Sequence, residues 1–485
     1  MYMAHRVSLH CGELTNRVEM RWLLNTYSYH AVNTALSKVL SPITYSTRHW
    51  TQTLYLNNDA HDVPWAMNIR MRRYFNEPLK GSFRLTHGIW TLERKITLPE
   101  TVQQKKKIRE QVQLTTALKR YRRLNILCNR QNPKYLCPLN EPLRPFLAIE
   151  YHREHYIEKG TENTARLTLD RDIRYWHQLT DRTWIPLGVE NGIRLEIKCD
   201  SCFLKTQAYS QIIRLLQHTH AVPVLSKRYV GLNRLNMWQR SIAPLPIDEI
   251  PGFEYEITFD VPEEKAQTIS AELFHVFKKG IKHFTIDPYR NWMSEQSMIR
   301  LYMGNNLRLN LYGDTFKWVW KRSAPHSPSH KIRIKTSREE KGSERLITPK
   351  QISEFFTRYR LQGALTRHKR QFWIRDKNER IYKISVHRSS NFTTVQHLTR
   401  LDLEYVGRAK PGDSQNALTT VTRQLQTVAR IIRKSFPALK PATASLRAYS
   451  WIHPKDINKH PALQILYGFN KLHHSIKINN CSIFG

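Results

Sequence analysis

Short segments of this chain place positively charged side chains on one face of a strand and apolar side chains on the other. In the segment NIRMRRYF, residues 68–75, an extended backbone sends Arg70 and Arg72 to one side and Ile69 and Met71 to the opposite side. Guanidinium and ammonium groups bind phosphate oxygens, and carboxylates hold divalent metal ions against them. Such a strand could bind a phosphate-rich ligand, or it could simply expose its charged face to water.

The same alternation recurs in other segments, where cations stand beside carboxylates. The residues on these charged faces are Glu19 and Arg21; Glu93 and Lys95; Arg166, Thr168, Asp170 and Asp172; and Arg194, Glu196 and Lys198. Repeated strands with one apolar and one charged face predict a closed sheet with a polar lumen and an apolar exterior that helices cover. The alternative is the solvated face of an antiparallel sandwich, with ion pairs across its strands.

The composition predicts a folded protein of two or three domains with a polyanionic partner. The chain has 485 residues, 40% of them hydrophobic, and its 77 Lys and Arg against 40 Asp and Glu give a net charge of +37. This excess favours nucleic acid, nucleotide or polyphosphate as the partner, with a membrane surface as the weaker alternative. The sequence shows neither an apolar run of membrane-spanning length nor the apolar core of a signal peptide. We therefore expect a cytoplasmic protein that a partner could recruit to a membrane.

The cysteines and the familiar catalytic motifs point to no other site. The six cysteines are scattered, which fits a reducing compartment. Cys199 and Cys202 have CxxC spacing, but no second pair stands near them in the sequence to complete a zinc site. The sequence contains neither a P-loop nor a GxGxxG motif. The charged strands therefore remain the principal candidate site.

A proline-rich linker, SIAPLPIDEIPGF, divides the chain. Before it, we expect a long, basic, amphipathic helix over residues 101–127, either solvated or guiding a polyanion, and a second helix over residues 207–220. The predicted domains are residues 1–243 and residues 244–440, followed by a basic C-terminal tail over residues 441–485.

The second half repeats the order of the first, with an acidic strand, a helix, a basic hairpin, basic strands, a late acidic strand and a final helix. FEYEITF puts Glu254 and Glu256 on one face, and the helix after it is expected to use Asp260 as its cap. A hairpin is expected to turn at Gly313, and a final helix to span about residues 416–434. The basic residues on the charged faces are Arg308, Lys321, Lys331, Arg333, Lys335, Arg367, Lys369 and Lys383, and the late carboxylates are Asp402 and Glu404.

At these segments the chain resembles the triphosphate tunnel metalloenzymes, the CYTH-like superfamily. The first half is similar to the VTC polyphosphate polymerase domain through VEMRWLL, IRMRRYF, LERK, YHREHYI, ARLTLDRDI, LEIK and LSKRYVGL, in that family's order over about residues 16–235. The second half resembles the CYTH-like and RNA-triphosphatase branch in divergent form, through FEYEITF, LRLNLYGDTFKWVWKR and LTRLDLEYVGR. The resemblance implies an α+β fold of two tandem antiparallel eight-stranded β-barrels with flanking helices.

The resemblance and the charged strand faces together assign roles to individual residues. The catalytic phosphate ligands would be Arg70, Arg72, Lys95, Arg166 and Lys227. Further substrate contacts would come from Arg21, Arg153, Lys198, Arg308, Lys321, Arg333, Lys335, Arg367, Lys369 and Lys383. The ligands for Mn²⁺ or Mg²⁺ would be Glu196, Glu19 and Glu93, with Glu256 and Glu404 in the second half. Arg21 stands where the family's first strand usually has lysine, so a planar fork replaces a point charge and the contact geometry differs. In the second half, Thr258 stands where the family has lysine and Asn310 where it has arginine, so the second site could be inactive or take another ligand.

Three functions are compatible with these residues. The first is a polyphosphate polymerase-like enzyme that moves the terminal phosphoryl of ATP onto a phosphate chain, with the second barrel as an accessory that could bind product. The second is a triphosphatase acting on RNA 5′ ends, nucleotides or inorganic triphosphate. The third is a non-catalytic protein that binds polyphosphate or nucleic acid. Phosphoryl transfer needs in-line positioning and charge neutralisation, so the lack of a nucleophile motif does not exclude an enzyme.

Overall fold

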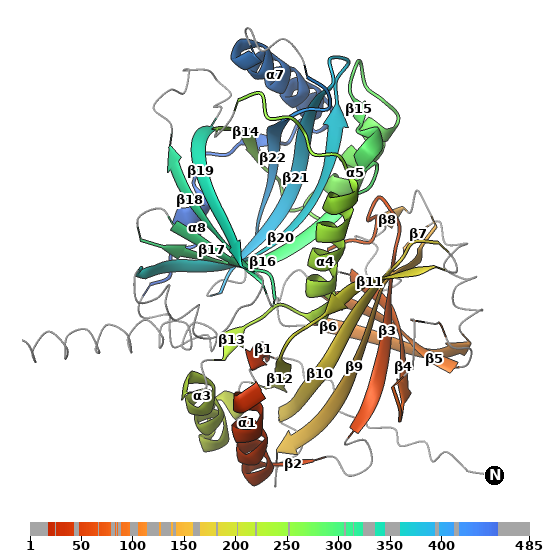
Figure 1. Cartoon of the computed structure of the whole chain (residues 1–485), viewed down its shortest axis with the longest axis vertical. Coiled ribbons are helices and arrows are strands. Elements are labelled where there is room, and N and C mark those ends of the chain that lie inside the picture. The colour runs from red at the N-terminus through yellow and green to blue at the C-terminus, as the bar shows by residue number, and fades with distance from the viewer. Residues whose placement is uncertain are drawn as a thin grey trace, which may run out of the picture.

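Two curved antiparallel sheets follow each other along the chain and lie one above the other in the computed structural model (Figure 1). The helices that flank them are α1 (Thr26–Val39), α3 (Gln207–His218), α4 (Lys227–Ile242), α5 (Ile269–Lys278), α7 (Ala417–Ser435) and the short α8 (Leu446–Tyr449). Figure 1 shows α1 and α3 beside the first sheet, α5 and α7 beside the second, and α4 between the two. The structure describes residues 18–24, 26–42, 48–65, 67–78, 83, 85, 89–97, 105–113, 126–127, 137–138, 142–158, 165–180, 183–200, 202–218, 221–250, 253–304, 307–313, 315–323, 335–344, 359–392, 397–411 and 417–453.

The first sheet is built from eleven strands. Along its main path the order is β13, β1, β12, β10, β9, β3, β4, β5 and β6, while β11 pairs with β10 and β2 with β9. These strands span Val18–Leu24 (β1), Leu40–Pro42 (β2), Arg48–Asn57 (β3), Met67–Phe75 (β4), Ile89–Thr97 (β5), Lys105–Gln113 (β6), Arg144–Glu158 (β9), Ala165–Gln178 (β10), Trp184–Val189 (β11), Ile193–Cys199 (β12) and Val222–Pro223 (β13). A separate pair consists of β7 (Ile126–Leu127) and β8 (Cys137–Pro138).

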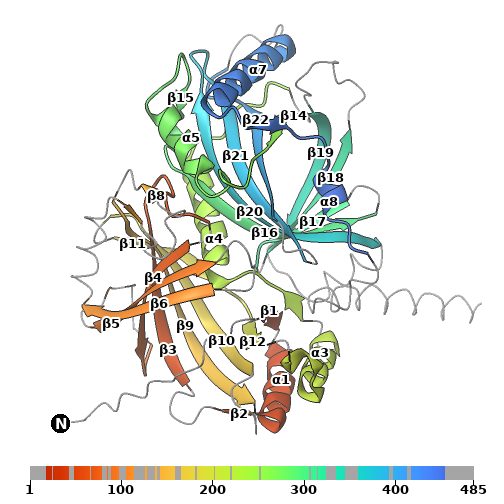
Figure 2. The ribbon, with the colours of Figure 1, turned by 180° about the vertical axis from the view of Figure 1, so that it is seen from behind.

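The first sheet curls until strands from its two ends approach each other. β5 lies six pairing steps from β1, and at about 4.8 Å a step a flat sheet would separate these strands by about 29 Å. Lys95 Nζ on β5 nevertheless lies 3.7 Å from Glu19 Oε2 on β1. Figure 2 shows β5 and β6 crossing in front of β3 and β9. Because Lys95 and Glu19 meet across the gap, the charged face is the concave face of the sheet.

The second sheet has ten strands, in the order β15, β20, β16, β17, β18, β19, β14, β22 and β21, with β23 paired to β14. They span Phe253–Asp260 (β14), Thr285–Ile286 (β15), Ser294–Met303 (β16), Leu307–Leu311 (β17), Phe316–Ser323 (β18), Lys335–Glu344 (β19), Leu361–Arg375 (β20), Arg380–Asn391 (β21), His397–Arg408 (β22) and Lys440–Pro441 (β23). β20 also pairs with β21, so the eight strands from β20 to β21 in this order form a closed ring of pairings.

The α+β class and the two antiparallel sheets agree with the sequence prediction, but the prediction of two closed barrels goes further than the structure does. In the first sheet, no pairing among the described residues joins β6 to β1 or β13. Among the described residues, strand pairing therefore closes a ring in the second sheet, whereas the first sheet curls without such a ring. The described part of the chain contains no helix with both the length and the apolarity needed to cross a membrane.

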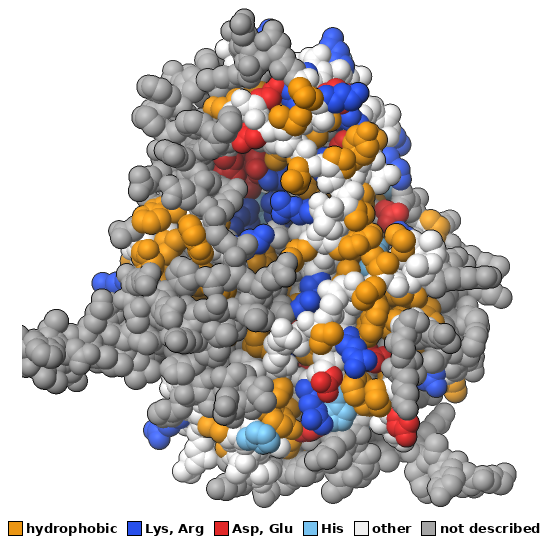
Figure 3. Space-filling view, viewed as in Figure 1, with side chains coloured by type: hydrophobic (Ala, Val, Ile, Leu, Met, Phe, Trp, Pro, Cys, Tyr) orange, Lys and Arg blue, Asp and Glu red, His pale blue; other side chains and the backbone are white. Residues whose placement is uncertain are grey.

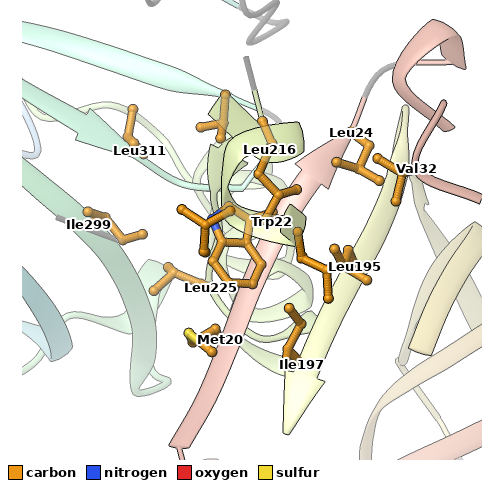
Figure 4. Packing of buried hydrophobic residues seen from close by; sticks show 14 of the residues in the cluster. Met20, Trp22, Leu24, Val32, Leu195, Ile197, Leu216, Leu225, Ile299 and Leu311 are labelled. Atoms are coloured by element: carbon orange, nitrogen blue, oxygen red, sulfur yellow. The ribbon is translucent and has the colours of Figure 1, made fainter. Parts of the chain in front are cut away.

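The apolar faces of both sheets pack into a shared core. Trp22 on β1 is 0% exposed and lies among Leu195, Leu216 and Leu225 (Figure 4). The same cluster includes Ile299 and other apolar residues of β16 and β17 in the second sheet. Because dense apolar packing resists movement, this contact fixes the two sheets relative to each other.

The structure confirms several predicted elements and corrects one of them. The helices over residues 207–220 and 416–434 appear as α3 and α7, and the hairpin at Gly313 joins β17 to β18. The helix over residues 101–127 is wrong where the chain is described, since residues 105–113 form β6 and pair with β5 along their full length. Pairing with an adjacent strand outweighs the helix preference of Lys, Glu and Gln. Residues 114–125 lie outside the described part of the chain.

Two aspartates also lie elsewhere than predicted. Asp260 does not cap a helix, because β14 extends to it and α5 begins only at Ile269; its Oδ1 instead accepts a hydrogen bond from Arg400 Nε at 2.8 Å. Asp172 leaves the charged face of β10, where the pairing with β9 shifts in register and the backbone of Asp172 has a φ of 55°. Such a bulge turns the side chain away from the alternating pattern.

We predict that Gly313→Ala destabilises the packing of the second sheet on α4. Gly313 has a φ of +117°, and an added β-carbon would lie 2.6 Å from Val230 Cγ2. The free energy of unfolding in urea should fall by about 2–3 kcal/mol because of backbone strain and the clash. Gly304→Ala, in the preceding turn, is the matched control, because its β-carbon would meet no described atom within 4 Å. Equal stability of the two variants would contradict the prediction.

Candidate functional site

The register of the first sheet brings charged residues of β1, β12, β10 and β9 side by side on the concave face. Across β1 and β12, Arg21 lies opposite Glu196. Across β10 and β9, Asp170 lies opposite Arg153. Directly opposed side chains in an antiparallel pair have β-carbons about 4.5–5.5 Å apart, so each cation has a carboxylate within reach.

Glu19 and Glu196 form the first group, bridged by the same two cations. Arg21 Nη2 lies 2.7 Å from Glu19 Oε1, and Arg21 Nε donates to Glu196 Oε1 at 3.2 Å. Lys198 Nζ lies 3.3 Å from Glu19 Oε1 and 3.0 Å from Glu196 Oε1. Lys95 approaches Glu19 from β5, so the two carboxylates lie where β1 and β5 come together in the curled sheet.

Asp170 is the centre of the second group and is 0% exposed. Arg153 donates to both of its oxygens, at 2.6 and 2.8 Å, and the ammonium of Lys227 at the start of α4 contacts Oδ2. Arg153 Nη2 also lies 3.6 Å from Glu196 Oε2, which joins this group to the first. The ring of Tyr151 faces both cations, with Lys227 Nζ 4.4 Å from its centroid.

Glu93 and two arginines form the third group, on β4 and β5. Arg70 Nε donates to Glu93 Oε2 at 2.5 Å, and Arg72 Nη1 lies 4.0 Å from the same oxygen. Tyr151 lies near cations of this group and of the second: burial would raise the pKa of its hydroxyl, but the charges of Arg153, Arg72 and Lys227 lower it. Arg166, half-buried on β10, lies close enough to Lys198 to lower its pKa.

These contacts set the ionisation of the buried groups. Burial would raise the pKa of Glu196, but Lys198 and Arg21 lower it to about 2. Burial would also raise the pKa of Asp170, and Arg153 and Lys227 hold it below its usual range instead. Burial lowers the pKa of Lys198 to about 7, although Glu196 and Glu19 oppose this shift. Glu196 and Asp170 are therefore ionised at neutral pH and are weak bases.

The charges on the concave face do not balance. The contacts above involve four carboxylates, Glu19, Glu93, Asp170 and Glu196, and eight cations, Arg21, Arg70, Arg72, Lys95, Arg153, Arg166, Lys198 and Lys227. The excess is positive and largely shielded from water, which raises the strength of its interaction with an anion. Arginine forks suit bidentate contact with phosphate oxygens.

The carboxylates of the first sheet fit a divalent ion in part. Mg²⁺ in phosphate-binding sites takes one or two carboxylates and completes its shell with substrate oxygens and water. Glu19 and Glu196, bridged by the same cations, supply such a pair. Glu93, predicted as a further ligand, is ion-paired with Arg70 and stays a prediction. Among the described residues of the first sheet, no three His, Cys, Asp or Glu side chains have ligand atoms within 4.8 Å of one another.

The second sheet carries a comparable cluster of charges. Glu254, Glu256 and Glu404 have carboxylate oxygens within 4.8 Å of one another, a spacing that could hold a metal ion. Lys383 contacts Glu404, and burial and the charge of Lys383 lower the pKa of Lys369 to about 7. In Figure 3, acidic and basic side chains lie together in a recess of this unit, between the elements labelled β19 and β21 in Figure 1.

The other second-half residues are placed less uniformly. Arg367 Nη2 donates to Asp402 Oδ2 at 3.1 Å, and His387 Nε2 lies 2.7 Å from the same oxygen. Arg308 lies over the Tyr302 ring, with its Cζ 5.7 Å from the centroid. The side chains of Lys321 and Lys335, and the whole of Lys331 and Arg333, lie outside the described part of the chain. The second-half assignments therefore stay predictions.

Sequence reasoning missed the residues that organise these clusters. In the first sheet they are Asp170, which was placed on the charged face without a role, and Tyr151. Tyr151 could have been found from its spacing, since it precedes Arg153 by two residues and so shares its face of β9. In the second sheet, the corresponding residues are Asp402, which accepts a hydrogen bond from Arg367, and His387, which contacts the same carboxylate oxygen.

A protein-family model matches the first half of the chain. Residues 16–236 match the family model described as the VTC domain, which covers β1 through Asn236 in α4. This match confirms the resemblance that the segments of the first half indicated. The second sheet lies outside the match. No curated protein matches the chain.

Three solved structures align with part of this chain at low similarity. A candidate adenylate cyclase from Vibrio parahaemolyticus is 10% identical and aligns with 43% of this chain and 90% of its own, with a TM-score of 0.24. An adenylyl cyclase candidate from Hippeastrum, described as having a dominant triphosphatase activity, is 12% identical over 44% and 94%, with a TM-score of 0.24. A chain of the Schizosaccharomyces pombe Mediator head module is 13% identical over 39% and 98%, with a TM-score of 0.25. At these TM-scores none of the three carries an inference about this chain.

We predict that Asp170→Asn destabilises the protein and that a polyanion restores much of the loss. The substitution leaves Arg153 and Lys227 without their buried counter-charge, which should lower the free energy of unfolding by about 3–5 kcal/mol. Inorganic tripolyphosphate should raise the melting temperature of the variant more than that of the wild type, because it supplies the missing negative charge.

The control for this prediction is Glu263→Gln. Glu263 is 59% exposed and lies 3.7 Å from Arg388, so its loss should cost less than about 1 kcal/mol. A destabilisation of Asp170→Asn no larger than that of the control would contradict the account of Asp170 as the centre of a buried charge cluster.

Proposed function

We propose that the first sheet is the catalytic site of a polyphosphate polymerase-like phosphotransferase, which moves the terminal phosphoryl of ATP onto a growing phosphate chain. One observation carries the proposal: cations from β1, β4, β5, β9, β10, β12 and α4 converge on one shielded concave face, within the segment that matches the VTC domain. Such a face fits a linear chain of phosphates better than a single small anion.

The cations divide the work by their chemistry. Arg70, Arg72 and Arg153 present planar forks that can each bind two phosphate oxygens. Lys95 supplies compact charge near Glu19, and Lys227 supplies it near Asp170. Phosphate oxygens would replace the carboxylates as partners of these cations. Ligand binding would therefore exchange one set of ion pairs for another.

Mn²⁺ or Mg²⁺ would bind Glu19 and Glu196 together with phosphate oxygens. A divalent ion there would withdraw charge from the terminal phosphate and favour cleavage of its bridging bond. The residues of the chain would hold donor and acceptor in line, which is the larger part of what this reaction requires.

The ion pairs favour a phosphate acceptor over water. An ionised oxygen at the end of the phosphate chain attacks the terminal phosphorus of ATP, a new P–O bond forms, the bond to the bridging oxygen breaks, and ADP leaves without any proton transfer. Water would have to lose a proton to a base. Glu196 and Asp170 are poor bases because cations lower their pKa values, and Glu19 and Glu93 are both ion-paired.

Product analysis tests this assignment. Purified full-length protein incubated with ATP and Mn²⁺ should yield ADP and phosphate chains that lengthen with time on a gel. ADP with free phosphate and no chains would replace the proposal by a triphosphatase. Binding of ATP or polyphosphate without turnover, in Mn²⁺ and in Mg²⁺, would leave a non-catalytic polyanion-binding protein.

We predict that the double substitution Arg70→Gln/Arg72→Gln lowers kcat/KM for ATP at least about 100-fold. Each charge-assisted hydrogen bond contributes about 1.5–3 kcal/mol, and two of them are removed. Lys205→Gln/Arg214→Gln changes the net charge equally at two exposed positions of the same sheet's flanking elements and should retain most activity. A similar loss in both double variants would mean that overall charge, rather than the concave face, determines the activity.

A further inference from the structure

A buried carboxylate of the second sheet, Glu295, lies at the boundary between the two sheets. Its side chain is 0% exposed and faces cationic or polar groups from three other segments. Arg228 Nη1 of α4 lies 3.2 Å from Glu295 Oε1. His61 Nδ1, in the loop between β3 and β4, lies 3.0 Å from Oε2, and Arg370 Nε of β20 lies 3.5 Å from it. A buried carboxylate in such surroundings strongly restrains the groups around it.

The cluster restrains two segments that lead into the first-sheet site. Arg370 donates to the carbonyl oxygens of His61 at 2.8 Å and Val63 at 2.7 Å, in the loop that leads into β4. β4 carries the arginines at positions 70 and 72. Arg228 directly follows Lys227, the first residue of α4. Lys227 contacts Asp170 in the first sheet while Arg228 contacts Glu295 in the second, so the first turn of α4 is held from both sides.

We infer that Glu295 is a positioning residue for the first-sheet site and acts through Arg228 on Lys227. Neighbouring residues in a helical turn share one rigid backbone, so a guanidinium fixed by Glu295 fixes the point from which the Lys227 ammonium reaches Asp170. The second sheet thus helps to hold one cation of the first-sheet site, Lys227, in place. The inference rests on the proposed function only in the role of Lys227 as a phosphate ligand, and its first test needs no ligand.

The first test measures how accessible the Lys227 amine is in the ligand-free full-length protein. In the wild type this amine contacts Asp170, and 14% of its side chain is exposed. Acetic anhydride labelling, followed by mass spectrometry of the Lys227 peptide, should be several-fold faster in Glu295→Gln. Unchanged labelling in a folded Glu295→Gln variant overturns the inference.

A matched control separates positioning from general loosening of the boundary between the sheets. Asp62 is also a buried carboxylate at this boundary, and its Oδ1 lies 2.9 Å from His275 Nε2 of α5 rather than beside α4. Asp62→Asn should leave Lys227 labelling at the wild-type rate. Equal acceleration in Asp62→Asn and Glu295→Gln would overturn the specific role of Glu295.

A second variant covers the case in which Glu295→Gln does not fold. Arg228→Met removes the link between Glu295 and α4 and leaves Glu295 with His61 and Arg370. It should accelerate the labelling of Lys227 as Glu295→Gln does. Wild-type labelling in folded Arg228→Met overturns the inference independently.

A double-substitution cycle tests the consequence for ligand binding. Calorimetric titration with inorganic tripolyphosphate should show Glu295→Gln and Lys227→Gln each weakening binding about 10-fold, and the double variant no weaker than Lys227→Gln alone. Additive losses would overturn the route through Lys227. A wild-type protein that binds tripolyphosphate but makes no chains would overturn the proposed function, while the coupling between Glu295 and Lys227 would still stand on the labelling and the cycle.

Discussion

Repulsion among cations on the concave face of a curled sheet is the constraint on which the rest of the first unit depends. At an effective dielectric constant near 20, two like charges about 4 Å apart cost roughly 4 kcal/mol. The four carboxylates Glu19, Glu93, Asp170 and Glu196 offset part of that cost, and each is placed beside at least one cation. The remaining positive charge can be neutralised by an anion from outside. The cation cluster therefore lowers the free energy of unfolding when the site is empty, and a bound polyanion restores part of it.

Because the sheet curls, the cations that repel one another share one concave surface that can bind an anion. Alternation along each strand sends Met20 and Trp22 into the apolar core and Glu19 and Arg21 to the concave side. A flat sheet would leave the cations spread over a wide, wet surface, where screening weakens them. Because β5 returns to β1, charges from distant strands share one shielded space. The second sheet adds to this through the shared core and the first turn of α4, so it is part of the site's support as well as a separate charged unit.

The sequence was informative where a periodic pattern reports burial directly. The faces of β1, β4, β5 and β12 follow from the alternation of charged and apolar residues. The seven motif segments of the first half indicated the family whose model then matched residues 16–236. It misled where tertiary pairing overrides local preference, as in β6, whose Lys, Glu and Gln residues favour a helix in isolation. It also misled at Asp172, because a bulge breaks the alternation without a signal in residue type.

Other features could not be predicted because they depend on geometry between distant segments. The contact of Lys95 with Glu19 requires the curvature of the sheet, which strand patterns do not specify. Glu295 stands alone among uncharged residues before Arg300 in β16, and its partners come from a loop, a helix and another strand. A residue of this kind is recognised only once the two sheets are seen together.

Whether phosphates occupy the concave face of the first sheet can be seen in a crystal structure with a non-hydrolysable ATP analogue and Mn²⁺. We expect phosphate oxygens within hydrogen-bonding distance of Arg70, Arg153 and Lys227, and an anomalous Mn²⁺ peak beside Glu19 and Glu196. Phosphates bound to exposed lysines and arginines on the outer surface, with the ion pairs of the concave face undisturbed, would contradict this expectation.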